Sequence, residues 1–367
     1  MRTFLSSTQG MLAIGGVLVA VAALLPLLNI SLPGILPGAT YTPGALSMLA
    51  YAFLISALAL SYHLIFGVGG MLSFGHAMFF SAGAYGLGIG LHLLAPTGIP
   101  AWAVFALAIA ATLVLALVAG NLVGALALRV TGISFAMVTL AFAQAINVML
   151  RRNTGGLTGG EEGVILEVDM VPAFLVGVVN TRNVYWLALA ILVLVYLACV
   201  WIEKSRLGQV VVASRENELR VTVLGLRPYT VRLFIFVAGA LLAALAGMGF
   251  LLLQSAATPR ISTADFTLTL LVIVVLGGVG YRWGAIVGGI IYTVLDQRLS
   301  ALASASWIAD LPAVLHIPLS EPLFLLGMLF VLVVMFAPGG IVGLTHQLTR
   351  PRAKVTDRPE ALTDAGT

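Results

Sequence analysis

The residues best suited to polar chemistry gather in one stretch of this sequence, SRENELRVTVLGL at 214–226. Four charges fall within six positions of it, although only 9% of the chain is charged: Arg215, Glu216, Glu218 and Arg220. Six cations lie between 204 and 232, and burying them in a membrane would cost about 18 kcal/mol, at roughly 3 kcal/mol each. We therefore expect this stretch to lie in water.

Within it, the sequence predicts a short surface helix over 215–224. Acidic residues near its start suit the helix dipole, and Gly225 followed by Pro228 marks its end. Two interpretations remain open. The stretch is either a solvated loop that anchors the topology or a docking helix that takes force from a soluble partner.

Known catalytic motifs are missing from this sequence. Glu203 stands where a phosphate-binding loop before Lys204 and Ser205 would need glycine, and no GxSxG or HExxH motif occurs. The five histidines are scattered without metal spacing, and the single Cys199 forms no intramolecular disulfide. We expect a protein that is not an enzyme, with no cofactor and no metal. The lack of a buried carboxylate or histidine pair also weighs against a proton-coupled secondary transporter.

Uncharged polar residues offer a second kind of chemistry, weak contacts to a passing solute. Ser73 and His76, in GVGGMLSFGHAMFF at 67–80, are candidates for lining a polar route. Thr139, Gln144 and Asn147 recur at spacings that predict roughly one helical face. Such groups suit a zwitterion with an aliphatic side chain, or they hydrogen-bond between helices. Close helix packing is the alternative for the glycines, with GxxxG pairs at Gly86/Gly90 and Gly284/Gly288.

The elements that position these residues are apolar helices. Hydrophobic residues make up 60% of the 367 residues and the mean hydropathy is +1.10, which predicts an all-α polytopic integral membrane protein. Six runs approach or exceed the roughly 20 residues that cross about 30 Å of hydrocarbon: 10–30, 45–66, 101–128, 184–202, 230–255 and 321–342. Four shorter or Gly-interrupted segments complete a count of about ten, some of them broken or re-entrant: 72–93, 132–150, 266–281 and 284–302. If 266–302 is one broken element, the count is nine.

The distribution of lysine and arginine predicts the orientation. With the N-terminus in the cytoplasm and ten crossings, thirteen of the eighteen cations lie inside, as the positive-inside rule requires. The pI near 9.4 then reflects topology, and no basic domain indicates nucleic-acid binding. We expect a membrane domain over 1–345, with its charged loop at 203–230, and a disordered cytoplasmic tail over 346–367.

Several motifs together resemble a known family. Glu218 to Gly225, followed by FVAGALLAALAG, looks like the coupling loop of ABC-importer permeases, although Arg220 and Val221 stand where that signature often has alanines. The stretch 205–247 resembles the LivM-type permease of branched-chain amino acid importers. Four further motifs agree in the same order: GMLSFGHAMFFSAGAY at 70–85, VTLAFAQ with TGGLTGGEEG over 138–163, VLGGVGYRWGAIVGG at 275–289 and MFAPGGIVGL at 335–344.

The resemblance implies a mechanism and a set of partners. The chain would be the permease subunit of a binding-protein-dependent importer in the bacterial inner membrane, with both termini in the cytoplasm. It would pair with a homologous permease, two cytoplasmic ATPases and an external solute-binding protein. The residues expected to couple it to the ATPases are Arg215, Glu216, Asn217, Glu218 and Gly225.

Other interpretations remain. The solute could instead be urea or a short amide, which related permeases carry. The sequence also leaves open whether the partner permease is an identical chain or a homologous one. An ion-coupled transporter and a membrane-embedded enzyme are alternatives of other classes. The Gly-rich loop RRNTGGLTGGEEG at 151–163 is expected outside, as a mobile loop that either meets the binding protein or is merely solvated.

Overall fold

The computed structural model describes residues 8–30, 36–153 and 155–303, the separate positions Phe324, Gly327, Met328, Val331 and Met335, and residues 339–343. Its helices follow one another along the chain as α2 (Thr8–Leu24), α3 (Pro43–His63), α4 (Ala77–Leu94), α5 (Ala101–Ala127), α6 (Ile133–Arg151), α7 (Thr181–Lys204), α8 (Arg206–Glu216), α9 (Glu218–Val223), α10 (Pro228–Gln254), α11 (Ala264–Gly277) and α12 (Arg282–Ala303). The strands β1 (Val164–Ile165) and β2 (Ala256–Ala257) pair antiparallel. The predicted tail at 346–367 lies outside the described residues, as does more than half of the predicted span 321–342.

The fold is an all-α polytopic membrane protein, as predicted. Among the described residues, six helices are long and apolar enough to cross a membrane, and α11 with α12 makes up to seven. The count of ten is not confirmed. The axes of α11 and α12 differ by 117° across a short break, so the two predicted crossings at 266–281 and 284–302 form a broken span or a re-entrant loop. With 14 residues, α11 is about 21 Å long, which is too short to cross alone.

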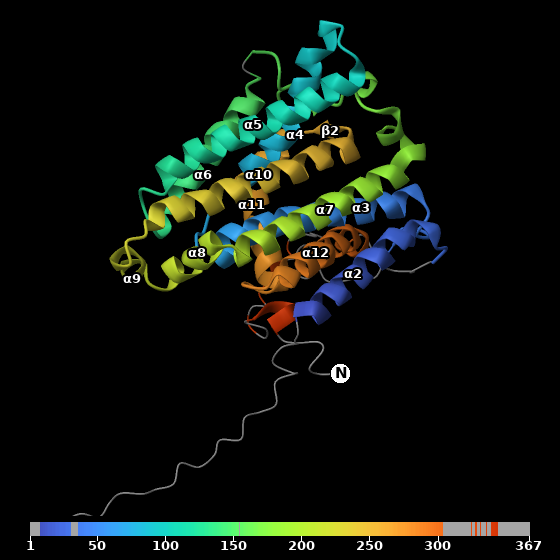
Figure 1. Ribbon diagram of the computed structural model, residues 1–367. Helices are drawn as coiled ribbons and strands as arrows, with labels where there is room; N and C mark the ends of the chain where they lie inside the picture. Colours follow the sequence, from blue (N-terminus) through green and yellow to red (C-terminus); the bar gives the residue numbers. More distant parts are fainter. Residues whose placement is uncertain are drawn as a thin grey trace, which may run out of the picture.

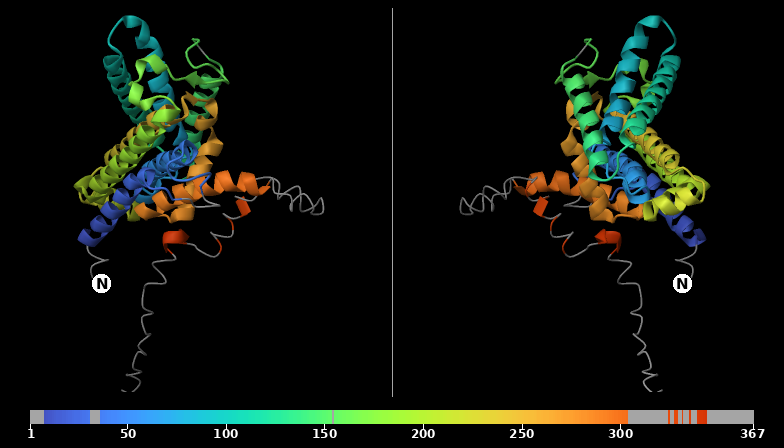
Figure 2. Two further views of the ribbon diagram at one scale, coloured as in Figure 1. Left: turned by 90° about the vertical axis from the view of Figure 1, so that its right-hand side faces the viewer. Right: turned by 90° about the vertical axis from the view of Figure 1, so that its left-hand side faces the viewer.

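The long helices lie side by side in one direction (Figure 1), and α12 runs across that direction (Figure 2). The centre of the bundle is formed by α3 and α10, whose apolar windows are 83% and 78% buried, whereas that of α5 is only 28% buried. Helix α10 packs against α3, α4, α5 and α7. Displacement of α10 therefore reaches most of the bundle.

Small residues bring the helices into close contact, as the packing interpretation predicted. A Cβ on Gly86 would lie 2.9 Å from Thr112, and one on Gly288 would lie 2.2 Å from the Ile273 carbonyl. The closest approach of α4 to α10 is at Gly83 and Gly247, where an added Cβ would lie 2.0 Å from a carbonyl oxygen of the other helix. In a membrane, such close backbone packing supplies much of the association energy of helices.

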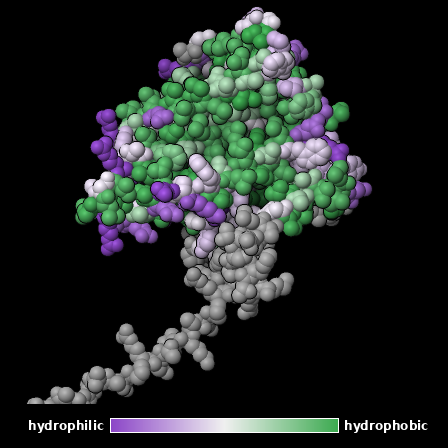
Figure 3. Space-filling model, in the orientation of Figure 1, coloured by the Kyte–Doolittle hydropathy of each residue, from purple (hydrophilic) through white to green (hydrophobic). Residues whose placement is uncertain are grey.

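Polar groups gather at the two ends of the long helices. Figure 3 shows a broad hydrophobic face, with hydrophilic residues at the left and right edges. Helices α8 and α9 lie at one end, which we call the α9 end, and the β1–β2 pair lies at the opposite end of α10, which we call the β end (Figure 1). A hydrophobic belt between two polar rims is what a bilayer requires.

Candidate functional site

The charged stretch forms two helices rather than the single helix predicted over 215–224. Asn217 is extended, with φ −155° and ψ 103°, so α8 ends at Glu216 and α9 begins at Glu218. The Asn217 side chain caps α9 by accepting a hydrogen bond from the Arg220 N–H (3.0 Å). Asparagine favours such a cap over a helix interior because its side chain competes for backbone groups. The expected coupling residue Asn217 thus has a structural role in the break.

The end of α9 depends on Gly225. Its φ is +80°, a left-handed conformation in which a Cβ is strained. The Gly225 N–H donates to the Thr222 carbonyl (2.9 Å), and the Leu226 N–H donates to the Val221 carbonyl (3.2 Å), a pattern that closes a helix end. Pro228 then begins α10. The predicted stop at Gly225 is therefore present.

Ion pairs and hydrogen bonds tie α8 and α9 to the bundle. Glu218 forms a 3.0 Å ion pair with Arg232 of α10, and Arg232 also donates to the Ser214 carbonyl of α8 (3.2 Å). Arg215 donates through Nη1 to the Gly67 carbonyl. Glu216 is exposed. Two of the predicted charges, Arg215 and Glu218, thus contact the rest of the bundle, and an ion pair joins α9 to α10.

Sequence reasoning missed the apolar side chains of α9. Val221 is 3% exposed and packs inward, whereas Leu219, Val223 and Leu224 are 73%, 80% and 76% exposed. Exposed leucine and valine next to a charged rim are typical of a surface that another protein covers. The alternation of Leu219, Val221 and Val223 with polar residues could have indicated this surface, but the prediction relied on the neighbouring charges.

A cavity of about 600 Å³ lies at the α9 end. Its walls are the segment after α3, the turn between α5 and α6, the start of α6, and one charged side chain each from α8, α9 and α10: Arg215, Glu218 and Arg232. Gly70 has φ +66°, and an added Cβ there would lie 2.7 Å from the Arg215 side chain. Glycine at this position allows the arginine to lie against the backbone.

The predicted route residues Ser73 and His76 lie in the segment between α3 and α4. Both are fully buried. The Tyr62 hydroxyl donates to the Ser73 carbonyl (3.0 Å), the Ser73 Oγ accepts from the Gly75 N–H (3.3 Å), and His76 Nε2 is 2.8 Å from Ser61 Oγ. Neither residue lines one of the two described cavities.

Side chains of other helices satisfy the backbone of this broken segment. The Phe74 N–H donates to Thr139 Oγ1 (3.1 Å), and the Ala77 N–H donates to Thr267 Oγ1 (3.2 Å). A non-helical backbone at membrane depth requires such partners. Hydrogen bonding between elements thus accounts for Thr139, while the pathway roles of Ser73, His76 and Thr139 remain predictions.

The three polar residues predicted on one face of α6 do not share a face. Thr139 and Asn147 are buried, whereas Gln144 is exposed and points away from them. A spacing of five residues rotates a side chain by about 140° around a helix, which separates Gln144 from Thr139. Of these three residues, only Gln144 therefore faces outward.

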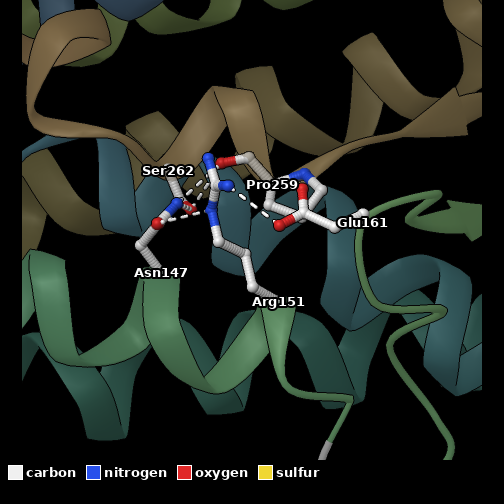
Figure 4. Close-up of polar contacts among 5 residues, drawn as sticks. All are labelled: Asn147, Arg151, Glu161, Pro259 and Ser262. Carbon is white, nitrogen blue, oxygen red and sulfur yellow. Dashed lines mark hydrogen bonds and ion pairs between the residues drawn. The ribbon is translucent and has the colours of Figure 1, made fainter.

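Asn147 joins α6 to the segment that precedes α11 (Figure 4). Its Nδ2 donates to the Pro259 carbonyl (2.9 Å) and to Ser262 Oγ (2.7 Å), and its Oδ1 accepts from Arg151 Nε (3.0 Å). Arg151 in turn pairs with Glu161 at 2.9 Å. The network connects α6, the Gly-rich loop and the segment at 259–262 at the β end.

The Gly-rich loop predicted as mobile has defined turns in its described part. Asn153 Oδ1 accepts hydrogen bonds from the N–H groups of Thr158 (2.9 Å) and Gly159 (3.1 Å). Positive φ values occur at its described glycines, Gly155, Gly156, Gly159, Gly160 and Gly163. These glycines therefore serve tight turns, and the loop leads directly into β1.

A partly buried charge cluster at the α9 end was also missed. Glu203 of α7 lies 3.5 Å from His63 Nε2 of α3 and 3.3 Å from Arg282 Nε of α12. His63 is only 1% exposed on its side chain. The three residues are far apart in the sequence, so no spacing could have predicted the contact. The cluster holds the ends of three helices together next to α8.

Comparisons with known proteins give a consistent result. Residues 44–344 match the family described as branched-chain amino acid transport system / permease component. The high-affinity branched-chain amino acid transport system permease protein LivM of Escherichia coli is 27% identical over 338 residues, which cover 85% of this chain and 72% of that protein. LivH of Salmonella typhimurium is 27% identical over 265 residues (68% and 83%), and a probable LivM of Methanocaldococcus jannaschii is 26% identical over 220 residues (59% and 61%).

Proposed function

Because the chain belongs to the branched-chain amino acid transport system permease family, we propose that it is the membrane permease subunit of a binding-protein-dependent ABC importer. Its solute is a branched-chain or related hydrophobic amino acid. Separate ATPase subunits supply the energy, since the sequence carries no phosphate-binding loop. The chain itself is not an enzyme but the path through which the solute moves.

The observation that carries this proposal is the shape of the α8–α9 unit, residues 206–223, which we call the coupling segment. Two capped helices present Leu219, Val223 and Leu224 to a partner, with the expected coupling residues Arg215, Glu216, Asn217, Glu218 and Gly225 around them. The Glu218–Arg232 ion pair joins α9 to α10, which contacts four other long helices. A rigid element of this kind passes on a displacement that an unstructured loop would absorb.

The charges support an orientation with the α9 end in the cytoplasm. Cations at that end include Arg129, Lys204, Arg206, Arg215, Arg220, Arg227, Arg232 and Arg282, whereas Arg151, Arg152, Arg182 and Arg260 lie at the β end. The positive-inside rule favours the richer end as the cytoplasmic one. The protein is then a multi-pass component of the bacterial inner membrane, with its N-terminus and the tail at 346–367 in the cytoplasm.

Four partners complete the importer. Similarity to both LivM and LivH supports pairing with a homologous permease. Gln144 of α6 faces outward and is available to line a path that the two permeases share. Two ATPases bind at the α9 end. A solute-binding protein meets the β end, where the Arg151–Glu161 pair and the Gly-rich loop are exposed.

Purification of the chain from its native membrane in mild detergent tests this assignment. We expect two copies of an ATPase and a second permease to co-elute, and the reconstituted complex to accumulate leucine only with ATP and the binding protein. Accumulation driven by an ion gradient without ATP would show a secondary transporter instead. A binding protein that takes up urea or a short amide and not leucine would change the solute.

A further inference from the structure

The structure assigns a second role to the coupling segment: we propose that the 600 Å³ cavity at the α9 end binds a zwitterionic amino acid with an aliphatic side chain. This inference rests on the proposed function, because it names a cytoplasmic site for the solute class of that importer. The proposed site is distinct from the buried Ser73 and His76, neither of which lines this cavity.

The cavity has the size of a small-molecule site. Its volume of about 600 Å³ lies within the roughly 300–1,000 Å³ typical of such sites. Most of its wall is apolar, including Leu72, Phe74, Val130, Ile133 and Phe135. An aliphatic side chain gains free energy by leaving water for a wall of this kind.

The polar part of the wall matches the two charges of an amino acid. Arg215 and Arg232 offer guanidinium groups, and Glu218 offers a carboxylate, so the wall has one positive charge in excess. Arg215 uses one Nη1 donor on Gly67 and keeps its other donors for a ligand carboxylate. The Nε of Arg232 is buried without a hydrogen-bond partner among the described residues. Glu218, half exposed, can accept from an ammonium group.

A phosphate or another simple anion fits this wall less well. The Glu218 carboxylate lies beside the guanidinium groups, so a multiply charged anion meets repulsion that an ammonium group would relieve. The large apolar wall would also remain uncovered. The mixture of one carboxylate, two guanidinium groups and an aliphatic wall favours a zwitterion.

Binding of tritium-labelled leucine to the purified importer in nanodiscs, without binding protein or nucleotide, tests the site. Thr131→Glu adds a carboxylate to the cavity wall, and Ser134→Glu adds the same charge three residues later, at an exposed position in the first turn of α6 that does not line the cavity. We expect saturable binding that Thr131→Glu weakens at least tenfold and Ser134→Glu leaves within twofold. Leucinamide, which lacks the carboxylate, should compete at least tenfold less well than leucine.

Three results would overturn the inference: no saturable binding, equal effects of the two variants, or displacement by orthophosphate as effective as that by leucine. Uptake of leucine by the same preparation, with ATP and the binding protein, separates this inference from the proposed function. Uptake without cavity binding overturns the site alone. Cavity binding without any ATP-dependent uptake overturns the importer assignment and leaves the site.

Discussion

At the scale of single residues, the polar groups of this chain divide between holding the fold and meeting a partner. Asn217, Thr139 and Asn147 each satisfy backbone groups at a helix break. Glu216 and Gln144 are exposed and free for contacts outside the chain. In the sequence, both groups are simply polar residues in a hydrophobic chain. Only the surroundings of each side chain in the structure show which residues hold the fold and which are exposed to a partner.

The Glu218–Arg232 pair provides the most direct test of coupling. We expect Glu218→Lys to leave membrane insertion intact, because Glu218 is half exposed and lies between the long apolar helices α7 and α10, outside the spans on which insertion depends. It should nevertheless reduce the leucine accumulated per ATP hydrolysed, because α9 loses its attachment to α10. Proteoliposomes with the ATPases and binding protein give both quantities. The reversed pair Glu218→Lys/Arg232→Glu should recover part of the ratio; no recovery would show that the pair does not orient α9.

Asn147 and Gln144 form a matched pair on α6. Asn147→Leu leaves the Arg151 Nε without its acceptor and removes the amide that joins α6 to Pro259 and Ser262. Loss of such a buried network costs about 1–3 kcal/mol, so thermal unfolding in detergent should begin several degrees lower. Gln144→Leu should change stability by less than about 0.5 kcal/mol and reduce uptake instead. Equal unfolding temperatures for the two variants would contradict this division.

At the scale of elements, the bundle depends on helices that touch through their backbones. The π-helical turn Leu64–Val68 ends α3, and the chain then passes through the segment at 69–76 before α4 begins. Serine and threonine side chains satisfy that segment, while glycines let α4 approach α10. Composition predicts this use of small residues, but the pairs that meet depend on the register of the helices.

Gly83 and Gly247 test that register. Valine at either position would place a Cβ 2.0 Å from a carbonyl of the facing helix, and overpacking of this kind typically costs about 1–3 kcal/mol. We expect Gly83→Val and Gly247→Val to lower the yield of monodisperse protein in fluorescence-detected size-exclusion chromatography. Gly16→Ala is the control, since nothing lies within 4 Å of its added Cβ. A normal yield from both valine variants would show that α4 and α10 do not touch there.

At the scale of the whole molecule, hydropathy predicted the class and the long helices but not the number of crossings. The windows at 266–281 and 284–302 are predicted to be two spans because hydropathy is summed only over neighbouring residues along the chain. The bend of 117° between α11 and α12 brings Gly277 into close contact with Gly284, an arrangement in space that such a sum cannot contain. The His63–Glu203–Arg282 cluster and the cavity likewise need the helices to be assembled first. What remains predictable is the charge asymmetry of the loop at 204–232, which holds six cations whatever the number of crossings elsewhere.

That asymmetry leads to a labelling experiment on the complete chain. The native Cys199 is buried and is replaced by alanine, after which single cysteines are placed at two exposed positions, Glu162→Cys in the Gly-rich loop and Thr222→Cys on α9. In right-side-out vesicles, a membrane-impermeant maleimide should label the cysteine at 162 at once and the cysteine at 222 only after permeabilisation. The positive-inside rule places the cation-rich end in the cytoplasm. The reverse labelling pattern would place the coupling segment outside the cell, where cytoplasmic ATPases could not bind it. Because position 162 lies between α6 and α7 and position 222 lies between α7 and α10, the outcome does not depend on whether α11 and α12 count as one crossing or none.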